Sequence, residues 1–174
     1  MIEFQPSGFS KGSYLNVGAG FLWWEKDHVS FDDFAGDRPW HDAVPGEPFA
    51  DKARDLALRA RVALLELRTR HSHVAKSAAW LDAQERLSNW GHFHAAVAFG
   101  ISGMLDAARA HFDEAIVPDN GIDWITALNR SCATLANLVA DHDAFVSHVL
   151  ESINRTRTRM GLSIIHPIDL IGSN

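Results

Sequence analysis

The stretch from Asn89 to Pro118 constrains the fold more than any other part of the chain. It reads NWGHFHAAVAFGISGMLDAARAHFDEAIVP, and Gly103 separates two short apolar segments with helical spacing. Small and large residues occupy positions where two helices would cross closely: Ala96, Gly100, Ala108 and Ala115 are small, and Phe99 and Phe112 are large. This pattern predicts a helical hairpin.

Helical periodicity continues on both sides of this hairpin. It predicts six helices, over residues 48–70, 74–87, 90–102, 104–117, 122–140 and 142–160. The expected caps are Ser72 for the second helix, Ser88 or Asn89 for the third, and Asp141 or Asp143 for the sixth. Gly161 is expected to end the last helix.

The N-terminal region has a period of two instead. Residues 13–24 alternate between large apolar and small or polar positions, which predicts a strand. Residues 25–27 predict a turn and residues 28–31 a returning strand, which together make a β-hairpin. Ile2 and Phe4 could supply a third, short strand. Because an isolated hairpin is marginally stable, the apolar C-terminal tail is expected to pair with it or to pack on the helices.

These elements define an α+β fold that is mostly α. We expect a single domain over residues 1–174, with a β-hairpin region (1–34), an acidic loop (35–47), a helical array (48–160) and an apolar C-terminal tail (161–174). The array is expected to be right-handed and α-solenoid-like, with about six helices. The acidic loop is interpreted as a solvated segment, the alternative being a surface for a basic partner.

Charge and cysteine content exclude several classes of protein. The net charge of -6 argues against a nucleic-acid binder, and the single cysteine, Cys132, excludes an internal disulfide. The N-terminus lacks the pattern of a secretion signal, and no apolar run reaches the ~20 residues that span a bilayer. We therefore expect a cytoplasmic protein of bacterial type that does not bind membranes.

The central hairpin carries the order A-x3-F-x2-A at Ala108, Phe112 and Ala115. Together with Ala96, Phe99 and Gly103, this makes residues 89–118 resemble a tetratricopeptide repeat. His92 stands at the usual Trp position, and Pro118 comes two residues early. The resemblance implies that the helices stack as pairs in a tetratricopeptide-like array.

A second resemblance concerns the N-terminal strands. The segment FQPSGFSKGSYLNVGAGFLW, residues 4–23, is similar to the strand pair of a bacterial domain family of unknown function, numbered 4304. This resemblance implies a helix and a strand ahead of the first residue, and it implies no chemistry.

Ten histidines are many for this length. The candidate metal ligands are His71, His73, His92 and His111. His92 and His94 cannot face one ion from a regular helix, because residues two apart point roughly 200° apart. The spacing H-E-x-x-H is absent. We therefore predict no metal and no cofactor, and a small metal-dependent hydrolase using these histidines is the alternative hypothesis.

Candidate binding residues are basic or aromatic. Arg54, Arg61 and Arg68 are seven residues apart and so form one stripe on the predicted helix 48–70, interpreted either as a solvated face or as a surface for an acidic partner. Trp40 is expected to be exposed in its polar loop. Arg155, Arg157 and Arg159 suit the dipole at a helix end, and they would also suit a phosphate.

No catalytic motif occurs in the chain. We therefore predict a protein–protein interaction or regulatory module and not an enzyme, with a bacterial immunity protein as one setting. The expected partner is another protein, and self-association is left open. Binding is expected through the concave helical face or through the arginine stripe.

Overall fold

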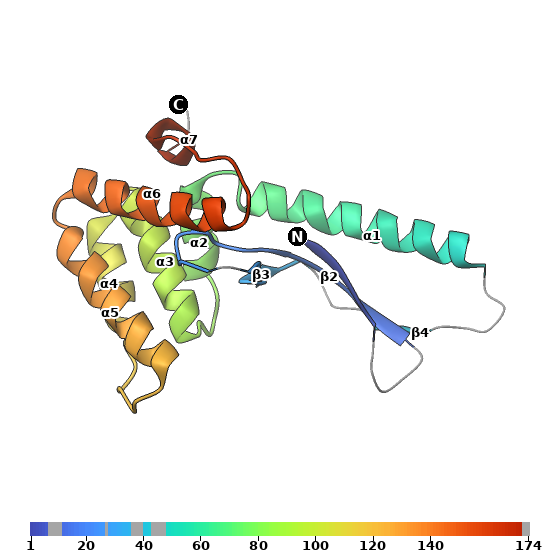
Figure 1. Ribbon diagram of the computed structural model, residues 1–174, viewed down its shortest axis with the longest axis horizontal. Helices are drawn as coiled ribbons and strands as arrows, with labels where there is room; N and C mark the ends of the chain where they lie inside the picture. The colour runs from blue at the N-terminus through green and yellow to red at the C-terminus, as the bar shows by residue number, and fades with distance from the viewer. Residues whose placement is uncertain (7–11, 27, 36–39, 43–47, 172–174) are drawn as a thin grey trace. The chain divides into compact units, whose positions relative to one another are not determined.

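The computed structural model describes residues 1–6, 12–26, 28–35, 40–42 and 48–171. The chain is mostly helical with an N-terminal antiparallel sheet (Figure 1). It forms two compact units, one from Met1–Gly20 and Val29–Thr69 and the other from Phe21–His28 and Arg70–Asn174. We call them the sheet unit and the helical unit. No helix in the described ranges is long and apolar enough to cross a membrane.

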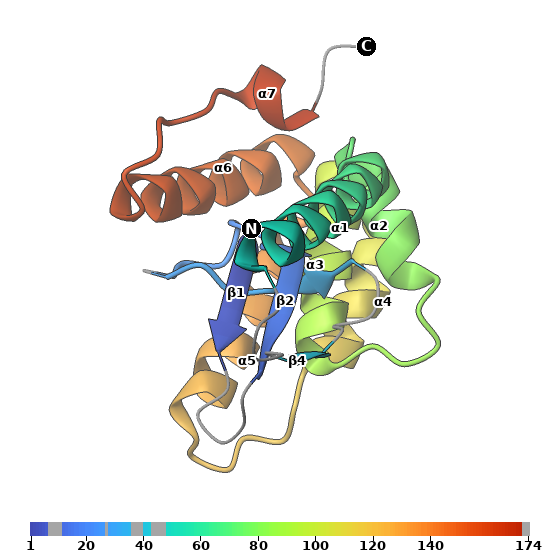
Figure 2. The same ribbon diagram turned by 90° about the vertical axis from the view of Figure 1, so that its right-hand side faces the viewer.

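The sheet unit is built around one central strand. Strand β2 (Gly12–Ala19) pairs antiparallel with β1 (Ile2–Pro6) on one edge, so that Ile2 faces Val17 and Phe4 faces Leu15. On its other edge, β2 pairs with the short strands β3 (Asp33–Phe34) and β4 (Trp40–Asp42). The first two strands run side by side in Figure 2. The predicted third strand at Ile2 and Phe4 is therefore confirmed.

Helix α1 (Phe49–Arg70) completes the sheet unit and confirms the predicted helix over 48–70. Its apolar face buries Ala60 and Leu67 against Leu15 and Val17 of β2, with Ala35 in the same cluster. This small core is the only buried apolar cluster that the described part of this unit contains.

Three predictions in this region need correction. The predicted strand 13–24 ends at Ala19, because Phe21–His28 belongs to the helical unit. The chain returns to the sheet only at Asp33, not at residues 28–31. The predicted acidic loop 35–47 contains a strand at Trp40–Asp42, and residues 36–39 and 43–47 lie outside the described residues.

The helical unit contains α2 (Val74–Asp82), α3 (Asn89–Ile101), α4 (Leu105–Ala115), α5 (Asp123–Leu138), α6 (His142–Arg159) and α7 (Pro167–Ile171). Consecutive helices from α2 to α6 contact one another, and α3 also contacts α6. The core is dense: Phe93, Phe112, Phe145 and Leu128 are fully buried.

The predicted central hairpin is confirmed in α3 and α4. Gly103 joins them with φ 75°, a left-handed conformation that glycine adopts without strain. Gly100 allows the closest approach, because a Cβ there would lie 2.4 Å from the ring of Phe145 on α6. Ser88 caps α3 and Asp141 caps α6 through their side chains, which confirms two of the predicted caps.

Other expectations need correction at helix ends. Helix α2 stops at Asp82 instead of residue 87, and its N-cap is His73 without a side-chain cap, not Ser72. Of the two roles expected for the C-terminal tail, the structure shows packing on the helices, because the tail forms the short helix α7, whose Leu170 joins the core. The first predicted helix pair is divided, since α1 lies in the sheet unit and α2 in the helical unit.

Candidate functional site

An apolar groove lies on the sheet unit between β1 and α1. Residues paired across antiparallel strands point to the same face of the sheet, so Ile2 and Phe4 share the face of Val17 and Leu15. Helix α1 covers Leu15 and Val17, whose exposed fractions are less than a tenth. It leaves Ile2 and Phe4 each 52% exposed. The resulting groove has a volume of about 510 Å³ and is lined by Ile2, Phe4, Leu15, Ala53, Leu56, Ala57, Ala60, Arg61 and Leu64.

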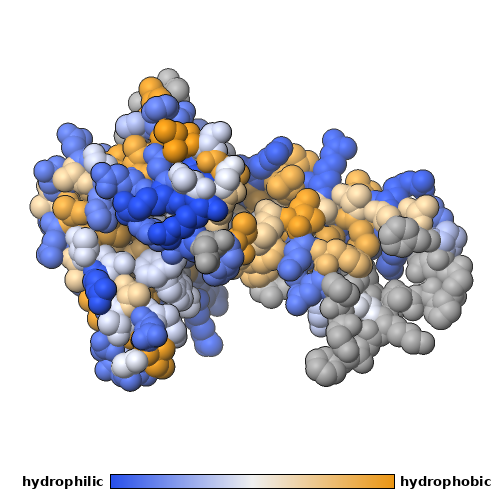
Figure 3. Space-filling model, in the orientation of Figure 1, coloured by the Kyte–Doolittle hydropathy of each residue, from blue (hydrophilic) through white to orange (hydrophobic). Residues whose placement is uncertain are grey.

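Helix α1 presents two further stripes beside this groove. Each residue of a helix is about 100° from the next, which places Arg54, Arg61 and Arg68 between the groove side and an outer apolar stripe. That stripe consists of Leu58, Val62 and Leu65, which are 53–61% exposed. Figure 3 shows hydrophobic surface along this helix. We call the groove, the arginine stripe and the outer apolar stripe together the β1–α1 face.

The three predicted arginines differ in their partners. Arg54 pairs with Asp51 at 3.0 Å, and both side chains are more than two thirds exposed. Arg61 lines the groove. Neither Arg61 nor Arg68 has an ion-pair partner among the residues that the structure describes. Trp40 begins β4, and its side chain lies outside the described part of the structure.

The second site is a cavity of about 260 Å³ in the helical unit. Its walls come from the Trp23–Glu25 segment, from one face of α5 and from one face of α6, with Phe93 of α3. The α5 residues are Arg130, Ser131, Thr134 and Leu135, and the α6 residues are His148, Val149, Ser152 and Arg155. We call it the α5–α6 pocket.

Several contacts fix the Trp23–Glu25 segment in place. The indole N–H of Trp23 donates to Nδ1 of His94 at 3.0 Å, and the Trp24 ring meets Trp90 edge-on at a centroid distance of 4.6 Å. The hydroxyl of the fully buried Thr156 donates to the carbonyl of Trp24. The two indoles are therefore positioned before any ligand arrives.

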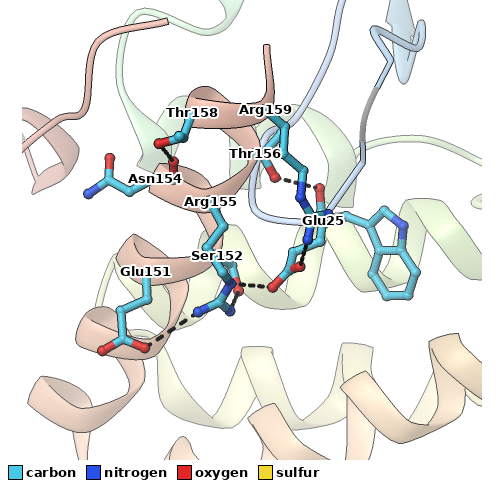
Figure 4. Close-up of polar contacts among 9 residues, drawn as sticks. Glu25, Glu151, Ser152, Asn154, Arg155, Thr156, Thr158 and Arg159 are labelled. Atoms are coloured by element: carbon cyan, nitrogen blue, oxygen red, sulfur yellow. Dashed lines mark hydrogen bonds and ion pairs between the residues drawn. The ribbon is translucent and has the colours of Figure 1, made fainter. Parts of the chain in front are cut away.

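Figure 4 shows how Glu25 is held against α6. Its carboxylate accepts from Nε of Arg155 and, at 3.0 Å, from Arg159. Arg155 also donates to Ser152 Oγ at 3.0 Å and lies 3.7 Å from Glu151. The guanidinium of Arg157 donates to the carbonyl of Ser163. All three arginines at this helix end are thus engaged within the protein.

The structure brings together two of the four predicted histidine ligands. Nδ1 of His92 lies 3.1 Å from Nδ1 of His111, whose Nε2 lies 3.1 Å from Asp82 Oδ1. Only one of the two facing nitrogens can carry a hydrogen in this geometry. Burial and the neighbouring His111 lower the pKa of His92, against an opposing effect of Glu114.

The other two histidines are not part of this chain of contacts. Nδ1 of His71 lies 2.9 Å from Ser77 Oγ and its ring meets Phe21 edge-on, and the exposed His73 is the N-cap of α2. In the described part of the chain, no three side chains of His, Cys, Asp or Glu converge as metal ligands would. The hydrolase hypothesis therefore gains no geometric support.

The sequence matches no protein-family model, no curated protein and no solved structure.

Proposed function

We propose that this chain is a protein-interaction module that binds an acidic, partly apolar segment of another protein through the β1–α1 face. The observation that carries the proposal is the uncovered groove over Ile2 and Phe4. Contiguous exposed apolar surface of this kind is typical of interaction sites. The outer apolar stripe of α1 extends that surface beyond the groove.

The shape of the groove favours an extended partner segment. Among the described strands, β1 pairs only with β2, so its outer edge has no strand beside it. An added strand would bond to this edge and place alternate side chains over the sheet face, as in other cases of β-strand addition. Ile2 and Phe4 would then contact apolar side chains of the partner.

Charge complementarity favours an acidic partner over a second copy of this chain. Helix α1 has six basic and three acidic residues, although the whole chain has a net charge of -6. Two copies of the β1–α1 face would bring two arginine stripes together, which like-charge repulsion opposes. Carboxylates beside the partner's apolar residues would instead pair with Arg61 and Arg68.

In this proposal the helical unit is a tetratricopeptide-like array. The contacts between consecutive helices from α2 to α6 support it, as does the glycine turn at Gly103. The additional α3–α6 contact departs from the neighbour-only contacts of an open solenoid. A bacterial immunity protein, which recognises one partner, remains one setting for such a module.

Site-specific photocrosslinking would identify the partner. A benzoylphenylalanine at Val62, on the outer apolar stripe, should capture a protein that the same group at the exposed Glu85 of the helical unit does not. Capture of only a second copy of this chain at Val62 would contradict the proposal.

Binding of the purified partner would then be measured by calorimetry. We expect R61E to weaken it about tenfold, or about 1.4 kcal/mol, because the substitution places a carboxylate at the groove. K52E is the matched control, since it makes the same charge change on α1 away from the groove. Equal losses in both variants would show that only the net charge of α1 matters and would contradict the proposed site.

A further inference from the structure

We infer that the α5–α6 pocket binds a small anionic ligand consisting of a planar ring that bears a phosphate group. This site lies in the helical unit and is independent of the proposed protein partner. Its volume of about 260 Å³ lies close to the lower end of the range for small-molecule sites, about 300–1,000 Å³. The pocket therefore suits one ring with one charged group and not a large cofactor.

The positive charge left over in the pocket favours an anion. Among the residues that the structure describes, Glu25 is the only carboxylate that lines the pocket, and Arg155 and Arg159 both pair with that carboxylate. Within residues 1–6, 12–26, 28–35, 40–42 and 48–171, the side chains of Arg130 and His148 form no hydrogen bond or ion pair. Two potential donors are thus unused at the pocket wall, in a chain whose net charge is -6.

Their spacing on the helices places these donors in one cavity. Arg130 and Thr134 are i, i+4 on α5, and His148 and Ser152 are i, i+4 on α6, so each pair lies on one face of its helix; Ser131 lines the same pocket. The hydroxyl of Thr134 already donates to the carbonyl of Arg130, whereas Ser131 has no polar side-chain partner among the described residues. Arg130, His148 and Ser131 therefore form a donor set for phosphate oxygens.

The other part of the lining favours a ring. Trp23, Trp24 and Phe93 line the pocket with Leu135 and Val149. Phe93 is 1% exposed, and both indoles are fixed by the contacts of Trp23 with His94 and of Trp24 with Trp90. Aromatic walls that are rigid before binding lower the entropic cost of holding a planar ligand. The ion pair of Glu25 with Arg155 fixes a further part of the wall.

The test is an NMR titration of the full-length, ¹⁵N-labelled protein with phenyl phosphate. We expect saturable shifts of the amides in residues 130–135 and 148–155. Inorganic phosphate and phenol should each bind at least about tenfold more weakly, because each probe lacks one half of the recognised group. No saturable shifts with millimolar phenyl phosphate, or equal affinity for inorganic phosphate, would overturn the inference.

Substitutions locate the binding energy at the pocket. R130Q should weaken phenyl phosphate about tenfold, about 1.4 kcal/mol, and H148Q should also weaken it, because each substitution removes one of the unused donors at the pocket wall. R86Q is the matched control, because Arg86 is likewise exposed and without a side-chain polar partner among the described residues of the helical unit. If R130Q and R86Q bind the probe equally well, the assigned site is wrong.

Discussion

Cys132 is a residue whose position decides its chemistry. It lies fully buried on α5, and burial raises the pKa of its thiol to about 11. Since the thiolate is the reactive form, we expect the native protein at pH 8 to react with dithionitrobenzoate far more slowly than the chain unfolded in urea. Release of thionitrobenzoate measures both rates. Rapid stoichiometric labelling of the native protein would contradict this burial.

The His92–His111 pair predicts a pH dependence of stability. The pKa of His92 is lower in the folded protein than in the unfolded chain, where it is about 6.5. Below about pH 6.5 the unfolded chain therefore binds more protons than the folded protein. The contribution of His92 to the free energy of unfolding should therefore be fully present above pH 6.5. It should be lost as the pH falls through the folded-state pKa. His111, Glu114 and Asp82 are the charged or titratable neighbours in these contacts.

The measurement is urea unfolding of wild type and H92Q between pH 5 and pH 7.5. H92Q should show a shallower loss of stability at low pH, whereas H73Q, a change at an exposed histidine, should follow the wild type. An unchanged slope in H92Q would mean that this imidazole is not the group responsible.

The sequence predicts single residues of the sites but not their combination. The seven-residue spacing of Arg61 and its neighbours is a local signal, and it correctly places them on one side of a helix. Glu25 lies far along the chain from Arg130 and His148, which are on two consecutive helices. Only tertiary packing brings them to one cavity, so no rule based on sequence spacing could identify them. The abundance of tryptophan was the one sequence signal that pointed to the aromatic part of this pocket.

At the scale of elements, the crossing of α3 and α6 depends on Gly100. A Cβ there would lie 2.4 Å from the fully buried ring of Phe145. We expect G100A to destabilise the protein by about 1–3 kcal/mol, although alanine favours a helix over glycine by about 1 kcal/mol. Thermal unfolding followed by circular dichroism would measure the loss.

G91A is the control within the same helix. Its Cβ would meet mainly the end of the Leu87 side chain, which is partly exposed and can move. G91A should therefore cost less than G100A, and the substitution F145L should recover part of the G100A loss. A neutral G100A would show that the two helices do not pack as closely as described.

Periodicity predicted the long helices because each buries a single apolar stripe, as α5 does with Ile125, Leu128, Cys132 and Leu135. It failed at Phe21 and Trp23. Their alternation resembles a strand, but the two rings stack with each other at 4.6 Å and contact His94 of α3. The period of two in this segment therefore reflects the packing of aromatic residues against α3 and not the pairing of a strand in a sheet.

At the scale of the whole molecule, the helical unit takes Phe21–His28 from the N-terminal part of the chain. A fragment of residues 70–174 would lack Phe21, Trp23 and Trp24 and would expose the core around Phe93. We expect this fragment to lose its cooperative thermal transition in circular dichroism. A synthetic peptide of residues 21–28 should restore part of that transition.

A fragment that melts as sharply as the full-length protein, with or without the peptide, would contradict that expectation.

The same segment has a consequence for protein synthesis. Thr156, which binds the carbonyl of Trp24, follows it by 132 residues. At a translation rate of about 5–20 residues per second, a ribosome needs roughly 7–26 s to make that stretch. Trp23 and Trp24 therefore leave the exit tunnel long before α6 exists. During each round of translation, the carbonyl of Trp24 lacks its Thr156 partner until the last long helix emerges.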